Sequence, residues 1–236
     1  MNEYATSFGN SAADALPADR AKFIRKTYLL LAAAIMAFIA VEAVLFATPA
    51  AGMIANVIFS GGSMGWLLVL GLFMGVSFLA NRWATSETSK LTQFLGLGIF
   101  IVAEAVIFVP LIMISTYYAG DASVLMKAGI VTIGLFLGIT ATVFLTRSDF
   151  SFLGPILAIG GFIALGFIVS SAIFGFSIGS IFAFIMVAFA GTAILYETSN
   201  VLHRYSTNQH VAASLTLFAS IALLFWYILT IFSSRD

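Results

Sequence analysis

The sequence of 236 residues contains no cysteine, and only 8% of its side chains are charged. Without cysteine the chain has no disulfide, no zinc–thiolate site and no thiol nucleophile. Its two histidines, His203 and His210, have no partners at metal-ligand spacing, and neither an HExxH motif nor a Ser–His–Asp arrangement is present. Ten acidic and ten basic residues cancel, so the composition provides no basic surface for nucleic acid. These absences argue against an enzyme, a tight metal site and a nucleic-acid-binding protein.

The chain is instead strongly apolar: 61% of its residues are hydrophobic and its mean hydropathy is +1.11. Soluble domains carry about a quarter charged residues, so this is the composition of an integral membrane protein that lies in the lipid bilayer. A membrane-spanning helix needs about 20 mainly apolar residues. Seven such runs are present, at 27–48, 64–83, 91–118, 124–146, 153–174, 178–201 and 211–232. We therefore predict an all-α fold of seven transmembrane helices in residues 27–236, with one longer Gly/Ala/Ser-rich loop at 49–63.

The first 26 residues are polar and end in a basic cluster made of Arg20, Lys22, Arg25 and Lys26. This polar lead is too long for a signal peptide, so we expect the first apolar run to be a permanent span. Basic residues favour the cytoplasmic side of a membrane, and an N-terminus inside the cell places eight of the ten basic residues there. We predict a cytoplasmic tail at 1–26, and seven spans then place the C-terminus outside.

Three carboxylates, Glu42, Glu104 and Glu197, interrupt the apolar runs. A carboxylate at the centre of a membrane helix costs about +2.5–3.5 kcal/mol, so each is a functional candidate by default. Glu42 lies near the outer end of its run, where it either reaches the lipid headgroups or has a functional role. Glu197 lies near the cytoplasmic end of the sixth run.

Glu104 lies near the middle of the third run, in line with Gln93 and Ser115. Their spacing of 11 residues is close to three helical turns, which places all three on one stripe of the helix. The stripe either lines a polar interior or makes a buried hydrogen bond between helices. Pro110 cannot donate a hydrogen bond to the carbonyl of Val106, so we also expect a local break that leaves this oxygen free.

Glu197 shares a helix face with Asn200 and Arg204, three and seven residues further on. One interpretation is an interfacial Glu–Arg pair, which would contribute little to stability. The alternative is a carboxyl group that faces the seventh helix and senses pH. That helix has a polar stripe of its own, made of Thr216, Ser220 and Tyr227. Because the two polar faces belong to consecutive antiparallel helices, we expect Glu197 to face Ser220.

Three stretches of the sequence carry a family resemblance: RKTYLLLA before the first span, TRSDFSFLGPIL at 146–157, and ILYETSNVLHRYSTNQHVAASLTLFASIALLFWYIL near the C-terminus. They are similar to the Bax inhibitor-1 (TMBIM) family, and most closely to its bacterial YccA-like branch. The resemblance covers essentially the whole chain past residue 20. It implies a bacterial inner-membrane protein in which the last helix is central and wrapped by the other six.

The resemblance also implies two activities. One is a pH-sensitive calcium leak gated by acids on the sixth and seventh helices, and the other is binding and modulation of the membrane AAA protease FtsH. The first acid corresponds to Glu197, whereas the second falls on Ser220, which departs from the family pattern. Two carboxylates can share a proton and a Glu–Ser pair cannot. A single-acid sensor, or none, therefore stays open, with Glu104 as a substitute acid and Asp149 of the second motif as a further candidate.

Three functions remain open at this point. A cation or proton conduit would be lined by Glu104, Glu197, Ser220 and Tyr227, beside Asn200 and Arg204. Calcium takes 6–8 oxygen ligands, so we expect no cofactor beyond transiently bound calcium. An FtsH-interacting protein would use the polar tail, whose composition favours disorder. A proton-coupled transporter would need repeats and broken helices, for which Pro110 and the 49–63 loop give slight support.

Overall fold

The computed structural model describes residues 11–86, 89–118 and 123–234. Eight α-helices run through the described residues, and seven are long and apolar enough to cross a membrane. These seven are α1 (Pro17–Ala47), α3 (Gly62–Ala84), α4 (Lys90–Met113), α5 (Ser123–Thr146), α6 (Leu153–Phe174), α7 (Gly179–His203) and α8 (His210–Ser233). A short helix, α2 (Ala50–Ser60), and a π-helical segment, η1 (Ile114–Tyr118), complete the set. The predicted all-α fold with seven spans is confirmed.

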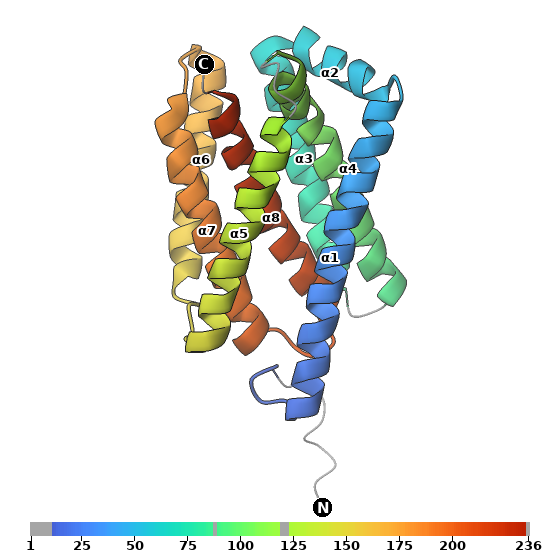
Figure 1. The fold of residues 1–236 in the computed structure, drawn as a ribbon, viewed down its shortest axis with the longest axis vertical. Coiled ribbons are helices and arrows are strands. Elements are labelled where there is room, and N and C mark those ends of the chain that lie inside the picture. The colour runs from blue at the N-terminus through green and yellow to red at the C-terminus, as the bar shows by residue number, and fades with distance from the viewer. Residues whose placement is uncertain (1–10, 87–88, 119–122, 235–236) are drawn as a thin grey trace, which may run out of the picture.

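Helix α8 is the centre of the bundle. It packs against α1, α3, α4, α5 and α7, and Figure 1 shows it behind α1 and α5 in the middle of the molecule. A helix that is apolar all round belongs in an interior, and α8 is buried along its length from Val211 to Leu229. Helix α6 packs instead against α7 and α3, so it forms an outer layer beside the helices that wrap α8.

The segment predicted as a loop at 49–63 contains helix α2, which packs against α1, α3 and α4. Ala51, Ala55 and Ile58 recur at helical spacing and are buried on these neighbours. The predicted turn is confined to Gly61 and Gly62, where Gly62 has a positive φ of 55°. A Cβ atom at Gly61 would lie 2.7 Å from the Cα of Gly65, so this turn requires glycine.

The expected break at Pro110 is wrong in its position. Helix α4 continues through the buried Pro110 to Met113, and the irregular backbone follows four residues later as the π-helical segment η1. Proline is tolerated inside membrane helices because neighbouring helices and local adjustments support the backbone groups that it leaves free.

The two ends of the bundle differ in what they carry. The end where α1 begins and α7 connects to α8 is called the N-terminal face, and the end that carries α2 is called the opposite face (Figure 1). The N-terminal face is the side predicted to be cytoplasmic. Residues 1–10 of the predicted tail and the C-terminal Arg235 lie outside the described residues.

Candidate functional site at the N-terminal face

Glu197 lies six residues before the end of α7 at His203, about 9 Å from the N-terminal face at 1.5 Å per residue. The hydroxyl group of Tyr205, in the turn between α7 and α8, donates a hydrogen bond to Glu197 Oε2 at 3.4 Å. The same hydroxyl lies 3.1 Å from Thr216 Oγ1 on α8. The side chains of Thr216 and Asn200 are also within reach of the Glu197 carboxyl group. The acid is therefore half-buried and connected to both α8 and the turn.

Tyr205 is the residue that the sequence prediction missed. It lies in a short polar connection between two apolar runs, where nothing in the periodicity marks it as a partner of Glu197. Burial, and secondly the nearby Glu197 carboxylate, raise the pKa of the Tyr205 hydroxyl above its ordinary value. The hydroxyl therefore stays protonated at neutral pH and can donate a hydrogen bond to the carboxylate.

The expected contact between Glu197 and Ser220 is replaced by the contacts through Tyr205. The Ser220 hydroxyl donates to the Thr216 carbonyl of its own helix at 3.0 Å, as serine in a helix commonly does. Tyr227 lies two helical turns further along α8, in a separate buried cluster with Ala183 and Met186 of α7. Among the described contacts, Thr216 is the member of the α8 stripe that is linked to the acid, through the Tyr205 hydroxyl.

The expected pair between Glu197 and Arg204 does not form among the described residues. Arg204 follows the last residue of α7, and its backbone N–H donates to the Asn200 carbonyl at 2.8 Å as the C-terminal cap. Its side chain is exposed, and its charge acts on the exposed Asp149.

The N-terminal segment docks on the same turn. The Ala12 N–H donates to the Tyr205 carbonyl at 2.8 Å, and Ser11 forms an isolated antiparallel bridge with Ser206. Ala12 is 0% exposed. Arg20 Nη2 also donates to the Leu202 carbonyl at 3.4 Å. Tyr205 thus holds the segment with its backbone and Glu197 with its side chain. We call Ala12, Glu197, Tyr205 and Thr216 the Tyr205 junction.

Asp149 lies on the N-terminal face in the turn between α5 and α6. It accepts a hydrogen bond from the Ser151 N–H at 2.9 Å, and this bond lowers the pKa of its exposed carboxyl group. Ser199 of α7 accepts from the Phe150 N–H at 2.8 Å and lies 3.5 Å from Asp149 Oδ1. Asp149 therefore helps to attach the α5–α6 turn to α7, outside the Tyr205 junction.

The polar stripe predicted along α4 does not act as one unit. Gln93 donates to the Ser86 carbonyl at 2.7 Å, and the Ser115 hydroxyl lies 2.7 Å from that of Ser233 on α8. Glu104 lies between them and is 7% exposed. Its position is about 21 Å along α4 from Lys90, near the middle of the bundle.

Glu42 lies five residues before the end of α1 at the opposite face and is 8% exposed. Glu197, Glu104 and Glu42 therefore occupy three depths, on three helices that all pack against α8. In the part of the chain that the structure describes, no group of three or more His, Asp or Glu side chains could hold a metal ion. The arrangement suits proton or transient ion contacts.

Comparison with known proteins places these features in one family. The sequence profile described as "Inhibitor of apoptosis-promoting Bax1" matches residues 20–236. The chain is 31% identical to the modulator of FtsH protease YccA of Escherichia coli, over 91% of this chain and 92% of YccA. It is 32% identical to Protein LIFEGUARD 4 of Arabidopsis thaliana, over 91% and 85% of the two chains. It is also 27% identical to Bax inhibitor 1 of Schizosaccharomyces pombe, over 90% and 76%. No solved structure matches.

Proposed function

The chain belongs to the Bax inhibitor-1 family, and we propose that within this family it modulates an FtsH-type membrane protease in the bacterial inner membrane. The proposal is supported by the relative named as a modulator of FtsH protease, which aligns with 91% of this chain. The structural observation that carries it is the Tyr205 junction, which holds the segment before α1 against the N-terminal face. The predicted orientation puts this face in the cytoplasm.

A protease that acts on membrane proteins needs a chain segment outside the bilayer, and chain termini are the usual points of attack. Residues 11–16 are such a segment, and the described contacts that attach them are the Ala12–Tyr205 backbone hydrogen bond, the buried side chain of Ala12 and the bridge between Ser11 and Ser206. An attachment this small lets the segment alternate between a docked form and a released form that the protease can engage. Engagement without degradation of the buried bundle would occupy the protease and so modulate it.

Glu197 could also regulate the docking of this segment, because it contacts Tyr205. The Tyr205 hydroxyl donates to Glu197, while the Tyr205 carbonyl accepts from Ala12. A change of charge or of bound cation at Glu197 would alter the position of the Tyr205 side chain, and the carbonyl of the same residue would follow. The acid at the end of α7 would thereby regulate how long the segment stays docked.

The test is co-purification of the tagged full-length protein with FtsH from membranes, beside a variant that lacks residues 2–16. The deletion ends before α1 begins at Pro17, so it removes the segment and leaves the bundle intact. We expect the full-length protein to retain FtsH and to slow FtsH degradation of a membrane substrate in proteoliposomes, and the shortened protein to do neither. If the shortened protein still retains FtsH, the segment is not part of the mechanism. If neither protein retains FtsH, the proposed function is wrong.

A second candidate function is a calcium or proton leak, favoured by the buried Glu42 and Glu104 and the half-buried Glu197, which lie at three depths around α8. Intramembrane acids at such positions commonly mark ion paths. The test is calcium flux into liposomes that contain the purified protein, measured across pH. Glu104→Gln and Glu197→Gln should each reduce the flux, while Asp149→Asn, at an exposed acid, should not. If Glu104→Gln and Glu197→Gln both give the same calcium flux as the parent protein, the proposed ion path is wrong.

A further inference from the structure

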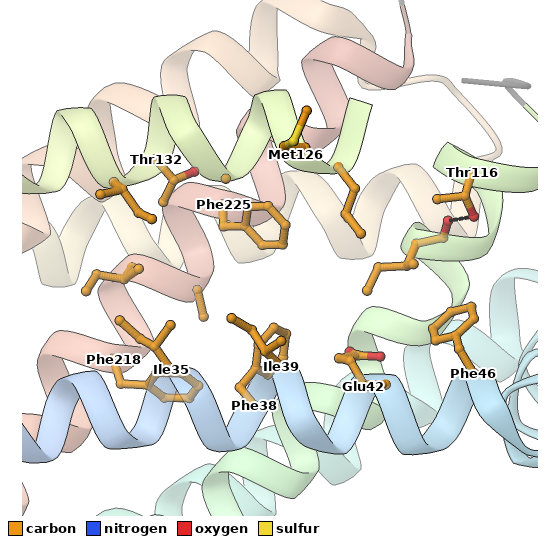
Figure 2. Close-up of a pocket in the computed structure, with 17 residues that line it drawn as sticks. Ile35, Phe38, Ile39, Glu42, Phe46, Thr116, Met126, Thr132, Phe218 and Phe225 are labelled. Atoms are coloured by element: carbon orange, nitrogen blue, oxygen red, sulfur yellow. Dashed lines mark hydrogen bonds between the residues drawn. The ribbon is translucent and has the colours of Figure 1, made fainter. Parts of the chain in front are cut away.

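A cavity of about 800 Å³ lies between α1 and α5 in the half of the bundle next to the opposite face. Figure 2 shows α1 along one wall, α5 along the other and α8 between them. The floor contains Phe218, Ile221 and Ala222 of α8, all of which are buried. The mouth contains Ile39, Met126 and Ile133, which are 51%, 64% and 55% exposed. The cavity thus opens sideways, toward the lipid.

Toward the N-terminal face, aromatic rings hold α1 and α5 together. There Tyr28 of α1 contacts the rings of Phe136 and Phe144 of α5, with centroid distances of 6.5 and 5.7 Å. Beyond these rings the lining of α1 runs from Ile35 to Phe46, about 16 Å along the helix axis. Its length and volume are those of a site for one small amphipathic molecule, because ligand pockets measure about 300–1,000 Å³.

The apolar cavity contains one acidic side chain, Glu42, which a lipid tail would not satisfy. Of the described residues that line it, Glu42 alone is ionisable, and Figure 2 shows its carboxyl group at the α1 wall, turned toward the space between the helices. Glu42 is 8% exposed, and neither of its carboxyl oxygens has a hydrogen-bond partner among the described residues.

The cavity has two other polar side chains, Thr116 and Thr132, and both are satisfied within their own segments. Their hydroxyl groups donate to the carbonyls of Ile112 and Ala128, each at 2.7 Å. A buried carboxyl group without a partner is costly, and intramembrane acids are normally paired. A bound molecule with a cationic head would supply the missing partner, because no basic side chain is among the described residues that line the cavity.

We propose that this cavity binds a single-chain lipid-like amine taken from the adjacent membrane leaflet, with its ammonium group at Glu42 and its tail against α1, α5 and α8. Glu42 is five residues from the end of α1, about 7.5 Å, so the head lies close to the membrane surface. The remaining lining, from Ile35 to Ile39, reaches toward the membrane centre and contacts the tail. An ordinary acyl chain would fill the same space but would leave Glu42 unpaired. The site is separate from the Tyr205 junction, which lies at the other end of the bundle.

The experiment uses two photoreactive probes with the same twelve-carbon chain and diazirine, one ending in a primary amine and one in a methyl ether. The full-length protein in lipid nanodiscs is irradiated with each probe, and the labelled residues are identified by mass spectrometry. We expect the amine to label the α1 and α5 walls of the cavity at least about tenfold more than the ether, because a hydrogen bond to a charged group contributes more than that factor.

Three variants give the result its specificity. Glu42→Gln removes the charge and should reduce amine labelling about tenfold. Gly129→Phe should fill the cavity, because Gly129 lines it and a Cβ atom there meets nothing within 4 Å. Gly134→Phe on the same helix is the matched control. A Cβ atom at Gly134 also meets nothing within 4 Å, but Gly134 is not among the residues that line the cavity, so amine labelling of this variant should equal that of the parent protein.

Equal labelling by the two probes would mean that the cavity holds ordinary lipid tails, and it would overturn the proposal. Amine labelling that survives both Glu42→Gln and Gly129→Phe would overturn it as well. If Glu42→Gln does not fold, the comparison of the two probes and the pair of glycine variants still decide the matter.

Discussion

Replacing Ala12 with leucine should release the N-terminal segment from the Tyr205 junction. Ala12 is 0% exposed, and its N–H donates to the Tyr205 carbonyl at 2.8 Å. A backbone hydrogen bond contributes about 1 kcal/mol, and burial of one methyl group contributes about 0.8 kcal/mol. The two contacts of Ala12 therefore contribute about 2 kcal/mol to docking, which on their own corresponds to about thirty docked molecules for each released one. A larger side chain in a filled site costs about 1–3 kcal/mol, which is enough to cancel this preference.

Hydrogen exchange of residues 11–16, measured by mass spectrometry on the protein in nanodiscs, reports this opening directly. In the parent protein the Ala12 amide should exchange about thirtyfold more slowly than in an unstructured peptide, and in Ala12→Leu it should approach the peptide rate. Ala13 is exposed in the same turn, so Ala13→Leu is the matched control and should keep the slow exchange. If Ala12→Leu exchanges as slowly as the parent, Tyr205 does not hold the segment and the reasoning about the junction is refuted.

Three further predictions concern the surroundings of the site. Tyr205→Phe removes the hydroxyl that contacts Thr216 and Glu197, so it should lower the free energy of unfolding in micelles by about 1–2 kcal/mol; unchanged stability would show that the acid does not need this donor. Gly96→Ala should destabilise by about 1–3 kcal/mol, because its Cβ atom would lie 2.6 Å from the Ala80 carbonyl oxygen, whereas Gly71→Ala, with open space at its Cβ position, should not. The Ser151 N–H lowers the pKa of Asp149, so its contribution to stability is present at neutral pH and is lost as the pH falls through that lowered pKa. NMR titration of the Asp149 carboxyl group should therefore give a midpoint below the ordinary value of about 3.9, and a midpoint at or above it would contradict the turn geometry.

The spans were predictable because the length of an apolar run reports directly on the thickness of the membrane. The beginning of α1 was not, because Pro17 lies ten residues before the first apolar run, where hydropathy carries no signal. Helix α2 was missed for a different reason. Its 11 residues are too few to span a membrane and rich in alanine and glycine, and a helix this short forms because its apolar face packs on neighbours.

At the Tyr205 junction, the sequence predicted the acid but not its partners. Glu197 stands out because a carboxylate inside an apolar run is costly, and its depth near the N-terminal face follows from its place in that run. Its partners do not follow, because helical spacing holds only while the helix continues. Helix α7 ends at His203, so Tyr205, which donates to Glu197, comes from the connection that follows the helix. Helical spacing predicted the Ser220 hydroxyl as a partner, but this hydroxyl donates to the Thr216 carbonyl of its own helix.

The two proposed sites share one rigid element, since the segment that docks at Tyr205 continues into α1 and Glu42 lies near the other end of that helix. Helix α1 is 31 residues long, or about 46 Å, and coupling between its ends would require it to move as a body against α8. The Ser214 hydroxyl of α8 donates to the Thr27 carbonyl of α1 at 2.8 Å, and both residues are 0% exposed. This contact lies between the two sites and opposes such movement, because breaking it would lose a buried hydrogen bond between the two helices. The sites should therefore be independent: Glu42→Gln should leave hydrogen exchange of residues 11–16 unchanged, and a change there would show that α1 moves as a unit.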